Sequence, residues 1–356
     1  MRKAQSPLRP RRGGTWSWVI AALVGLAAAT TACGSGGGAL PTPTDVAGSA
    51  TSTAATPEPT ETPTPPGPVT IVAVGDIMLA RSIGQRILSA GGGAVFDEAI
   101  GSTLRGADIT IGNLECVISE RGEAQPKGYT FRADPEVVEA LALGGFDAVS
   151  LANNHANDFG ADGLRDTVAH LADRQIAAPG AGSNLAAASA PAVIERNGLR
   201  VAVVGLVDVP SEGVGFSRQT WEAGADRWGV AWADAETVAR SVQAARAEAD
   251  VVVAMLHFGF EYHATPSESQ RTLARAAIDA GATLVIGSHP HVLQEVEEYG
   301  GGLIAYSLGN FVFDGFDGDA NTSAILLVTL DRDGLRSWEM LPVEIVDNGL
   351  PRLSGE

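Results

Sequence analysis

Two patterns of apolar residues alternate along residues 68–346. Spacings of three and four residues, as for Leu164, Val168 and Leu171, are typical of amphipathic helices. Short runs that are apolar at nearly every position are typical of buried strands. We expect helices over 135–143, 163–173, 234–249 and 267–280, and strands over 69–74, 109–111, 148–151, 199–207, 251–256 and 283–286. This alternation predicts an α/β fold with helices packed outside the sheet, followed by a strand-rich segment over 303–346.

The first 32 residues lack this alternation and are typical of a secretory signal peptide. Residues 1–12 carry five basic side chains and no acidic one, and an apolar run follows over 16–29. Small residues then lead to Cys33. The apolar run is shorter than the ~20 residues that span a bilayer, which favours a signal peptide at 1–32 over an uncleaved membrane anchor. The uncleaved anchor remains the alternative.

Cys33 suggests how the chain is held at the membrane. The stretch Thr30-Thr31-Ala32-Cys33-Gly34 resembles a bacterial lipoprotein cleavage box, in which the cysteine becomes the lipidated first residue. The alternative is a chance cysteine at an ordinary cleavage site. The resemblance implies an extracytoplasmic protein anchored to the cell membrane through an N-terminal lipid.

A polar segment separates this cysteine from the folded part. Residues 33–67 consist mainly of Gly, Ser, Thr, Pro and Ala, which cannot build a core, and predict a disordered tether spanning on the order of 30 Å. We expect the folded domain over 68–347 and a short C-terminal tail over 348–356.

Charge narrows the classes of partner. The formal net charge is −18, and without the five basic residues of the leader 19 basic residues face 42 acidic ones, a net charge of −23. Such a surface repels nucleic acid. An anionic substrate then needs a local positive centre, which a bound metal can provide. The only cysteine besides Cys33 is Cys116, so lipidation of Cys33 leaves no disulfide.

Several predicted strands lead directly into side chains that can bind metal. Open α/β sheets build their sites at the carboxyl ends of strands, so these side chains are expected to converge. Oxygen ligands combined with imidazoles suit one or two ions of Mn, Fe or Zn. The candidates are Asp76, Asn113, Glu115, Asn153, Asn154, His155, His257, His289 and His291.

The order of these residues resembles a known family. Six segments carry the resemblance: VGDIMLAR (74–81), GNLECVIS (112–119), LANNHANDFG (151–160), HFGFEY (257–262), GSHPHVLQ (287–294) and YSLGNFVFD (306–314). Together they resemble the CapA family of poly-γ-glutamate capsule synthesis, within the calcineurin-like metallophosphoesterase superfamily. The resemblance implies a metallophosphoesterase-like β-sandwich core flanked by helices on both sides, a four-layer αββα fold.

The resemblance also implies roles for individual residues. It assigns Asp76 and His291 to one metal, and Asn154, His257 and His289 to the other. Glu115 is expected to bridge the two metals, and His155 to act as general acid beside them. Met78 stands where related phosphoesterases carry a histidine ligand, so the first metal lacks one ligand.

Other residues are candidates for binding the substrate. Arg81, Lys127 and Arg132 could each grip an anionic group, and Arg132 is preferred because it lies between two of the matching segments. Surface salt bridges are the alternative for all three. Glu261 and Tyr262 follow His257 closely and are expected to line the pocket.

Three functions remain open at this point. The favoured one is a CapA-like cell-envelope protein in the synthesis, export or attachment of poly-γ-glutamate or a similar anionic polymer, working through a divalent-metal hydrolase-type site within a capsule-synthesis complex. The second is an extracytoplasmic metal-dependent phosphoesterase that acts on a small phosphate ester. The third is a non-catalytic surface binding module on the same fold.

Overall fold

The structure is a computed structural model that describes residues 67–210 and 216–355. The signal peptide, Cys33 and the tether expected from the sequence lie outside these residues. Within the described ranges, no helix is long and apolar enough to cross a membrane.

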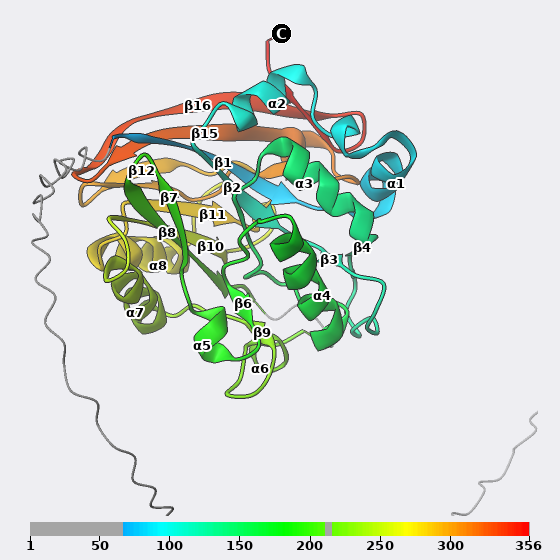
Figure 1. Ribbon diagram of the computed structural model, residues 1–356, viewed down its shortest axis with the longest axis horizontal. Coiled ribbons are helices and arrows are strands. Elements are labelled where there is room, and N and C mark those ends of the chain that lie inside the picture. Colours follow the sequence, from blue (N-terminus) through cyan, green and yellow to red (C-terminus); the bar gives the residue numbers. More distant parts are fainter. Residues whose placement is uncertain (1–66, 211–215, 356) are drawn as a thin grey trace, which may run out of the picture. The chain divides into compact units, whose positions relative to one another are not determined.

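Two sheets form the centre of the fold, and each contains a run of parallel strands (Figure 1). In the described residues, the first sheet contains, in order, β17 (Leu350–Leu353), β16 (Gly334–Val346), β15 (Thr322–Asp331), β1 (Val69–Ile77), β2 (Ile109–Leu114) and β5 (Ala148–Ser150). The short strand β14 (Asn310–Val312) also belongs to this sheet and pairs with β1. The second sheet contains, in order, β12 (Val296–Tyr299), β13 (Gly302–Ala305), β11 (Leu284–Ser288), β10 (Val251–Phe258), β8 (Leu199–Asp208) and β7 (Ala192–Arg196).

The two sheets pack face to face. Alternate residues of a strand point to the same face, and one buried cluster joins Ile71 and Val328 of the first sheet to Val203, Val253 and Ile286 of the second. This cluster is the inner core of a β-sandwich.

Helices cover both outer faces. Ile83 and Leu141 belong to the helical layer that packs on the first sheet, and Val242 and Leu273 belong to the layer on the second sheet. The first layer contains α1 (Arg81–Ala90), α2 (Glu98–Arg105), α3 (Val138–Gly144) and α4 (Gly160–Asp173), and the second contains α7 (Ala235–Arg246) and α8 (Glu268–Asp279). The expected four-layer αββα architecture is therefore confirmed (Figure 1).

Short elements complete the fold. They are β3 (Val117–Ile118), β4 (Arg132–Ala133), β6 (Ala181–Gly182), β9 (Gly229–Val230), α5 (Leu185–Ala188), α6 (Arg218–Trp221) and the 3₁₀ helices Gly92–Ala94, Pro135–Val137 and Gly318–Asn321.

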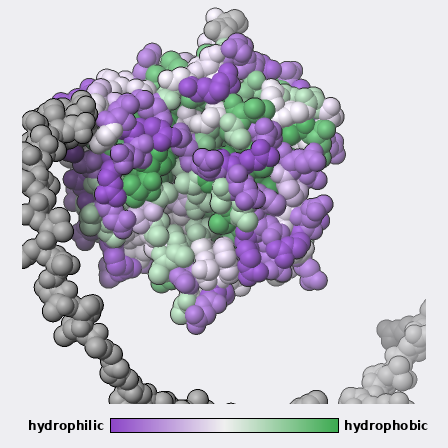
Figure 2. Space-filling view, viewed as in Figure 1, coloured by the Kyte–Doolittle hydropathy of each residue, from purple (hydrophilic) through white to green (hydrophobic). Residues whose placement is uncertain are grey.

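On the face shown in Figure 2, hydrophilic side chains predominate and hydrophobic ones form small groups between them.

The expected elements are present with small shifts at their ends. All six expected strands occur, and the four expected helices correspond to the Pro135–Val137 turn with α3, and to α4, α7 and α8. Helices α1 and α2 were not expected from the sequence. Residues 348–356 do not form the expected tail, because β17 lies there and pairs with β16, so the first sheet continues past residue 347.

A local irregularity in β1 places the first site residue. The register between β1 and β2 shifts between Ala73 and Asp76, and such bulges re-aim a side chain. A Cβ on Gly75 would lie 1.9 Å from the carbonyl oxygen of Gly309, while the backbone N–H of Asp76 donates to that same oxygen at 3.0 Å. Only glycine at position 75 permits this approach of two backbones.

We therefore predict that Gly75→Ala lowers the free energy of unfolding by about 1–3 kcal/mol, because the clash is with backbone that cannot rotate away. Gly93→Ala is the matched control, since nothing lies within 4 Å of a Cβ built there. Chemical denaturation of both variants measures the effect. Equal midpoints for wild type and Gly75→Ala would show that β1 and Gly309 are not held this closely.

Candidate metal centre

The candidate site lies where the carboxyl ends of both sheets meet. Asp76 and Asn113 lie at the end of β1 and β2 in the first sheet, and His257 lies at the end of β10 in the second. The amide Nδ2 of Asn113 donates to Asp76 Oδ1 at 2.8 Å and lies 3.3 Å from His257 Nδ1. The two sheets therefore contribute to one site, as the strand-end pattern predicted.

Glu115 lies at the centre of this site. Asp76, Glu115 and His257 are buried, and one ligand atom from each lies within 4.8 Å of the others. Glu115 Oε1 also lies 3.7 Å from His291 Nε2 and 4.0 Å from His155 Nε2. A carboxylate in this position could contact a cation on either side.

The remaining expected ligands flank His257. Its Nε2 lies 2.8 Å from Asn154 Oδ1, and its Nδ1 lies 2.9 Å from Ser288 Oγ. The backbone N–H of His289 donates to Asp76 Oδ2 at 3.2 Å, and its ring centroid lies 4.8 Å from that of His257. All six expected metal ligands therefore converge.

The donor set fits a divalent transition metal. Imidazoles, carboxylates and an amide oxygen are the ligands that Zn, Mn and Fe take in proteins. Within the described residues, His289 Nδ1 is buried without a hydrogen-bond partner, and such a buried orphan is rare unless an ion or water completes it. Met78 packs in the outer core, and its Sδ accepts the N–H of Ala80, so it offers no replacement for the missing histidine.

Burial lowers the pKa of three of the four histidines at the site. It lowers the pKa of His155 to about 4 and lowers the pKa values of His257 and His289 well below the ordinary value. Burial acts in the same direction on His291, but a hydrogen bond and the charge of Asp76 outweigh it and raise the pKa of His291. Three of the imidazoles are therefore neutral near pH 7, which is the form that binds metal.

His155 is held by a buried carboxylate that the sequence analysis did not identify. Its Nδ1 lies 2.7 Å from Asp158 Oδ2. Asp158 also accepts the N–H of Phe131 at 2.7 Å and pairs with Lys127 at 3.1 Å. This arrangement fixes the ring so that Nε2 faces Glu115. In the sequence, only the position of Asp158 three residues after His155 pointed to this contact.

Lys127 is buried in this network. Its side chain is 1% exposed, and its ammonium group donates to the backbone carbonyl of Asn154 at 2.8 Å. It therefore supports the loop that carries a ligand and the candidate acid. The expectation that it grips substrate does not agree with this position.

Asn310 was also missed. Its Oδ1 lies 2.9 Å from His291 Nδ1, and its backbone pairs in register with Asp76. Asn113 pairs with Asp76 from the other side. Both asparagines follow a glycine, at 112–113 and 309–310, and this repeated Gly-Asn pair was the signal in the sequence.

Backbone strain gathers around the site. Arg81, Tyr262, His289 and His291 all have positive φ, with values of 52°, 62°, 95° and 57°. Residues other than glycine rarely adopt a positive φ, and residues that do so cluster where a function requires a particular orientation. Both histidines of the His289-Pro290-His291 segment are therefore held against a local energetic preference.

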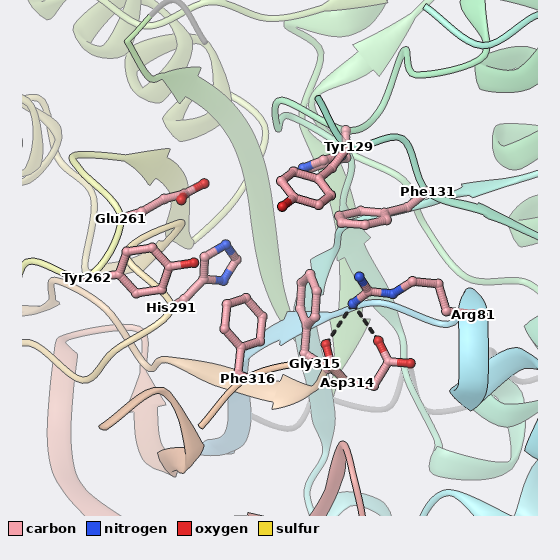
Figure 3. A pocket seen from close by; sticks show the side chains of 11 residues that line it. Arg81, Tyr129, Phe131, Glu261, Tyr262, His291, Asp314, Gly315 and Phe316 are labelled. Carbon is pink, nitrogen blue, oxygen red and sulfur yellow. Dashed lines mark hydrogen bonds and ion pairs between the residues drawn. The ribbon is translucent and has the colours of Figure 1, made fainter. Parts of the chain in front are cut away.

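A pocket opens beside the centre (Figure 3). His155 and His291 line it together with Arg81, Glu261 and Tyr262. Three of the five expected substrate-binding residues are thus at the pocket, and neither Lys127 nor Arg132 lines it. Arg132 is exposed, with its guanidinium 4.5 Å from the ring centre of Phe159.

The family follows from comparison with known proteins. Residues 70–315 match the model of the family described as bacterial capsule synthesis protein PGA_cap. The chain belongs to this capsule synthesis family. All six expected metal ligands, His155 and Asp158 lie inside the matched range.

Relatives in the capsule synthesis family cover most of the chain. The PGA biosynthesis protein CapA of Bacillus subtilis is 34% identical over 275 residues, which are 76% of this chain and 70% of that protein. The capsule biosynthesis protein CapA of Bacillus anthracis is 32% identical over 292 residues, 80% of this chain and 69% of that protein. Among solved structures, the match to a hypothetical protein from Thermus thermophilus covers 77% of this chain and 99% of that one, at 14% identity and a TM-score of 0.49.

The buried histidines predict that acid destabilises the chelated protein. The unfolded chain takes up protons on histidine near pH 6.5, whereas folded His155 does so only near pH 4. Stability should therefore fall between about pH 6.5 and 4, by up to about 1.4 kcal/mol per pH unit for each such histidine. His291, whose pKa is raised, acts in the opposite direction above about pH 6.5.

Thermal unfolding in chelator, measured from pH 7.5 to 4.5, tests this. His155→Gln should show a shallower decline than wild type, because one protonation difference is removed. Parallel curves for the two proteins would contradict the assignment of His155 as a buried neutral imidazole.

Proposed function

We propose that this chain is a cell-envelope protein that acts in the synthesis, export or attachment of poly-γ-glutamate or a similar anionic polymer, through a divalent-metal hydrolase-type site. The buried group of Asp76, Glu115 and His257 is the observation that carries this proposal. Membership of the capsule synthesis family supports the polymer, and the names of the two Bacillus relatives point to the same process.

The proposed metal ligands fall into two sets, one on each side of Glu115. Asp76 and His291, whose Oδ2 and Nδ1 lie 3.4 Å apart, hold one ion. Asn154, His257 and His289 hold the other. When bound, such a cation stabilises negative charge on the substrate and activates water. The donor set favours Mn, Fe or Zn, with the site that lacks a ligand at Met78 the weaker one.

In this proposal, His155 transfers the proton. Asp158 accepts a hydrogen bond from Nδ1, which leaves the Nε2 lone pair facing the site. Because burial lowers its pKa to about 4, the ring enters the reaction neutral. His155 therefore first accepts at Nε2 the proton that the attacking water gives up, and then donates it to the oxygen of the leaving group, while the carboxylate of Asp158 stabilises the intervening imidazolium.

The N-terminal sequence supports the proposed location. A signal peptide at 1–32, lipid on Cys33 and a tether over 33–67 would place the domain over 68–347 outside the cytoplasmic membrane. There it could join the other components of a capsule-synthesis complex. The net charge of −18 supports the exclusion of nucleic acid as a partner.

Replacement of His155 in the source bacterium tests the function. His155→Gln should leave the level of the protein unchanged, because the residue is not a proposed ligand, but lower the amount of γ-linked glutamate polymer at the cell surface at least tenfold. His170→Gln, on α4 away from the site, is the control. Polymer is measured chemically after hydrolysis, and protein by immunoblot.

Wild-type amounts of polymer in cells carrying His155→Gln would contradict the proposed role. If deletion of the whole gene also left polymer unchanged, the chain would instead act on another substrate with the same site, as an extracytoplasmic phosphoesterase would.

A further inference from the structure

The pocket beside the metal centre is small and sharply bounded. In Figure 3, Tyr129 and Phe131 lie on one side of it, and Glu261 and Tyr262 lie opposite, with His291 next to them. Its volume is about 200 Å³, below the roughly 300–1,000 Å³ of sites for drug-sized ligands. The pocket therefore has room for one ring-sized group adjacent to the metal centre, and further residues of a longer substrate would lie outside it.

Aromatic rings form a continuous wall of this pocket. The ring of Phe131 lies 4.2 Å from that of His155 and 5.6 Å from that of Phe313. The ring centroid of Phe313 lies 4.9 Å from that of Phe316, and the ring centroid of Phe316 lies 6.2 Å from that of Tyr262. Aromatic faces carry partial negative charge and attract the partly positive C–H groups of a saturated ring that lies flat on them.

Two tyrosines stand at the mouth. Tyr129 is 73% exposed and Tyr262 is 59% exposed. The backbone of Tyr262 is in the left-handed region, at φ 62°, and its N–H donates to the carbonyl of Pro290 at 2.8 Å. The positive φ of Tyr262 is energetically unfavourable, yet it holds a large and mostly exposed ring beside the site, which a packing role does not explain.

The charges of the pocket balance almost completely. Arg81 forms an ion pair with Asp314 and donates to its backbone carbonyl at 2.6 Å, and its guanidinium lies 4.8 Å from the ring centre of Phe131. In the described part of the chain, Glu261 forms no salt bridge. The charged residues that line the pocket outside the metal ligands therefore carry one net negative charge: Arg81, Asp314 and Glu261.

This balance limits what the pocket can hold. A second anionic group, such as the free carboxylate of a glutamyl residue, would find no unpaired cation there and would face Glu261. A cationic group would be repelled by metal ions held next to His291. An uncharged group is therefore favoured, and a ring with hydroxyl groups fits best because Glu261, Tyr129 and Tyr262 can hydrogen-bond it from the rim.

We propose that this pocket binds the pyranose ring of a glycosyl phosphate, with the phosphoryl group directed to the metal centre. The proposal rests on the metal-dependent function proposed above and narrows its substrate. The centre then acts on a sugar-phosphate linkage of the envelope, such as one that carries or anchors an anionic polymer, and not on the γ-glutamyl repeat.

Calorimetric titration of the purified full chain, loaded with Mn²⁺, tests the proposal with four probes. These are glucose 1-phosphate, glycerol 1-phosphate, phosphocholine and γ-glutamylglutamate. Glucose 1-phosphate should bind at least tenfold more tightly than glycerol 1-phosphate, which offers the same phosphate without a ring. Phosphocholine and γ-glutamylglutamate should not bind more tightly than glycerol 1-phosphate.

Variants locate the preference. Tyr262→Asn, whose new residue tolerates a positive φ, and Tyr129→Ala on the opposite wall should each abolish the preference for the ring while leaving glycerol 1-phosphate bound as before. Phe260→Ala is the matched control, because Phe260 is 47% exposed next to the site but does not line the pocket.

Each other outcome overturns the proposal in a recognisable way. Equal Mn²⁺-dependent binding of both phosphates would leave the metal centre standing and remove the sugar. A preference for phosphocholine that depends on Tyr262 would identify an ammonium pocket, and a preference for γ-glutamylglutamate would identify a glutamyl pocket. If no probe binds with Mn²⁺ present, the metal-dependent function itself fails.

Discussion

The fold depends on one electrostatic constraint, the burial of Asp76 and Glu115 among histidines where the two sheets meet. Buried carboxylates are costly unless they are paired or coordinate a cation. Burial keeps three of the surrounding imidazoles neutral, and of the four only His291, whose pKa Asp76 raises, can supply part of the balancing charge. The parallel strands, the bulge at Gly75 and the strained His289-Pro290-His291 segment all serve to bring these groups together. A bound divalent cation would satisfy the constraint that the rest of the structure imposes.

The same constraint separates the site into two halves with different preferences. With a metal bound as proposed, the centre would attract an oxyanion, whereas the adjoining pocket has aromatic walls and an arginine that is already paired with Asp314. Arg81 therefore shapes the pocket through packing and hydrogen bonds and does not act as an unpaired positive charge. Under the proposed function, this division would let a strongly acidic protein bind one charged group of a substrate and still discriminate by its neutral part.

The sequence predicted those features that repeat with a regular period or lie in one segment. Buried strands were found because nearly every residue in them is apolar, and the proposed ligands were identified as candidates because they follow those strands and lie in segments that resemble a known family. Helices α1 and α2 were missed although their buried residues recur four apart, at Ile83 and Ile87 and at Ile100 and Leu104. Asp158 was missed although it lies three residues after His155, whereas Asn310 was missed because its role depends on contacts between distant segments. Pairing of Asn310 with Asp76, for example, joins residues at opposite ends of the domain. Likewise, the sequence alone could not show that Lys127 is buried or that Arg132 lies away from the pocket.

The most direct test of this account is the metal content of the purified chain, measured by elemental analysis for wild type and Glu115→Ala after dialysis against Mn²⁺ or Zn²⁺. The account predicts one or two equivalents of metal per chain in wild type and a loss of at least one equivalent in Glu115→Ala, because that carboxylate lies between the two proposed ligand sets. Wild type that retains no metal under these conditions would contradict the metal centre and the hydrolase function built on it.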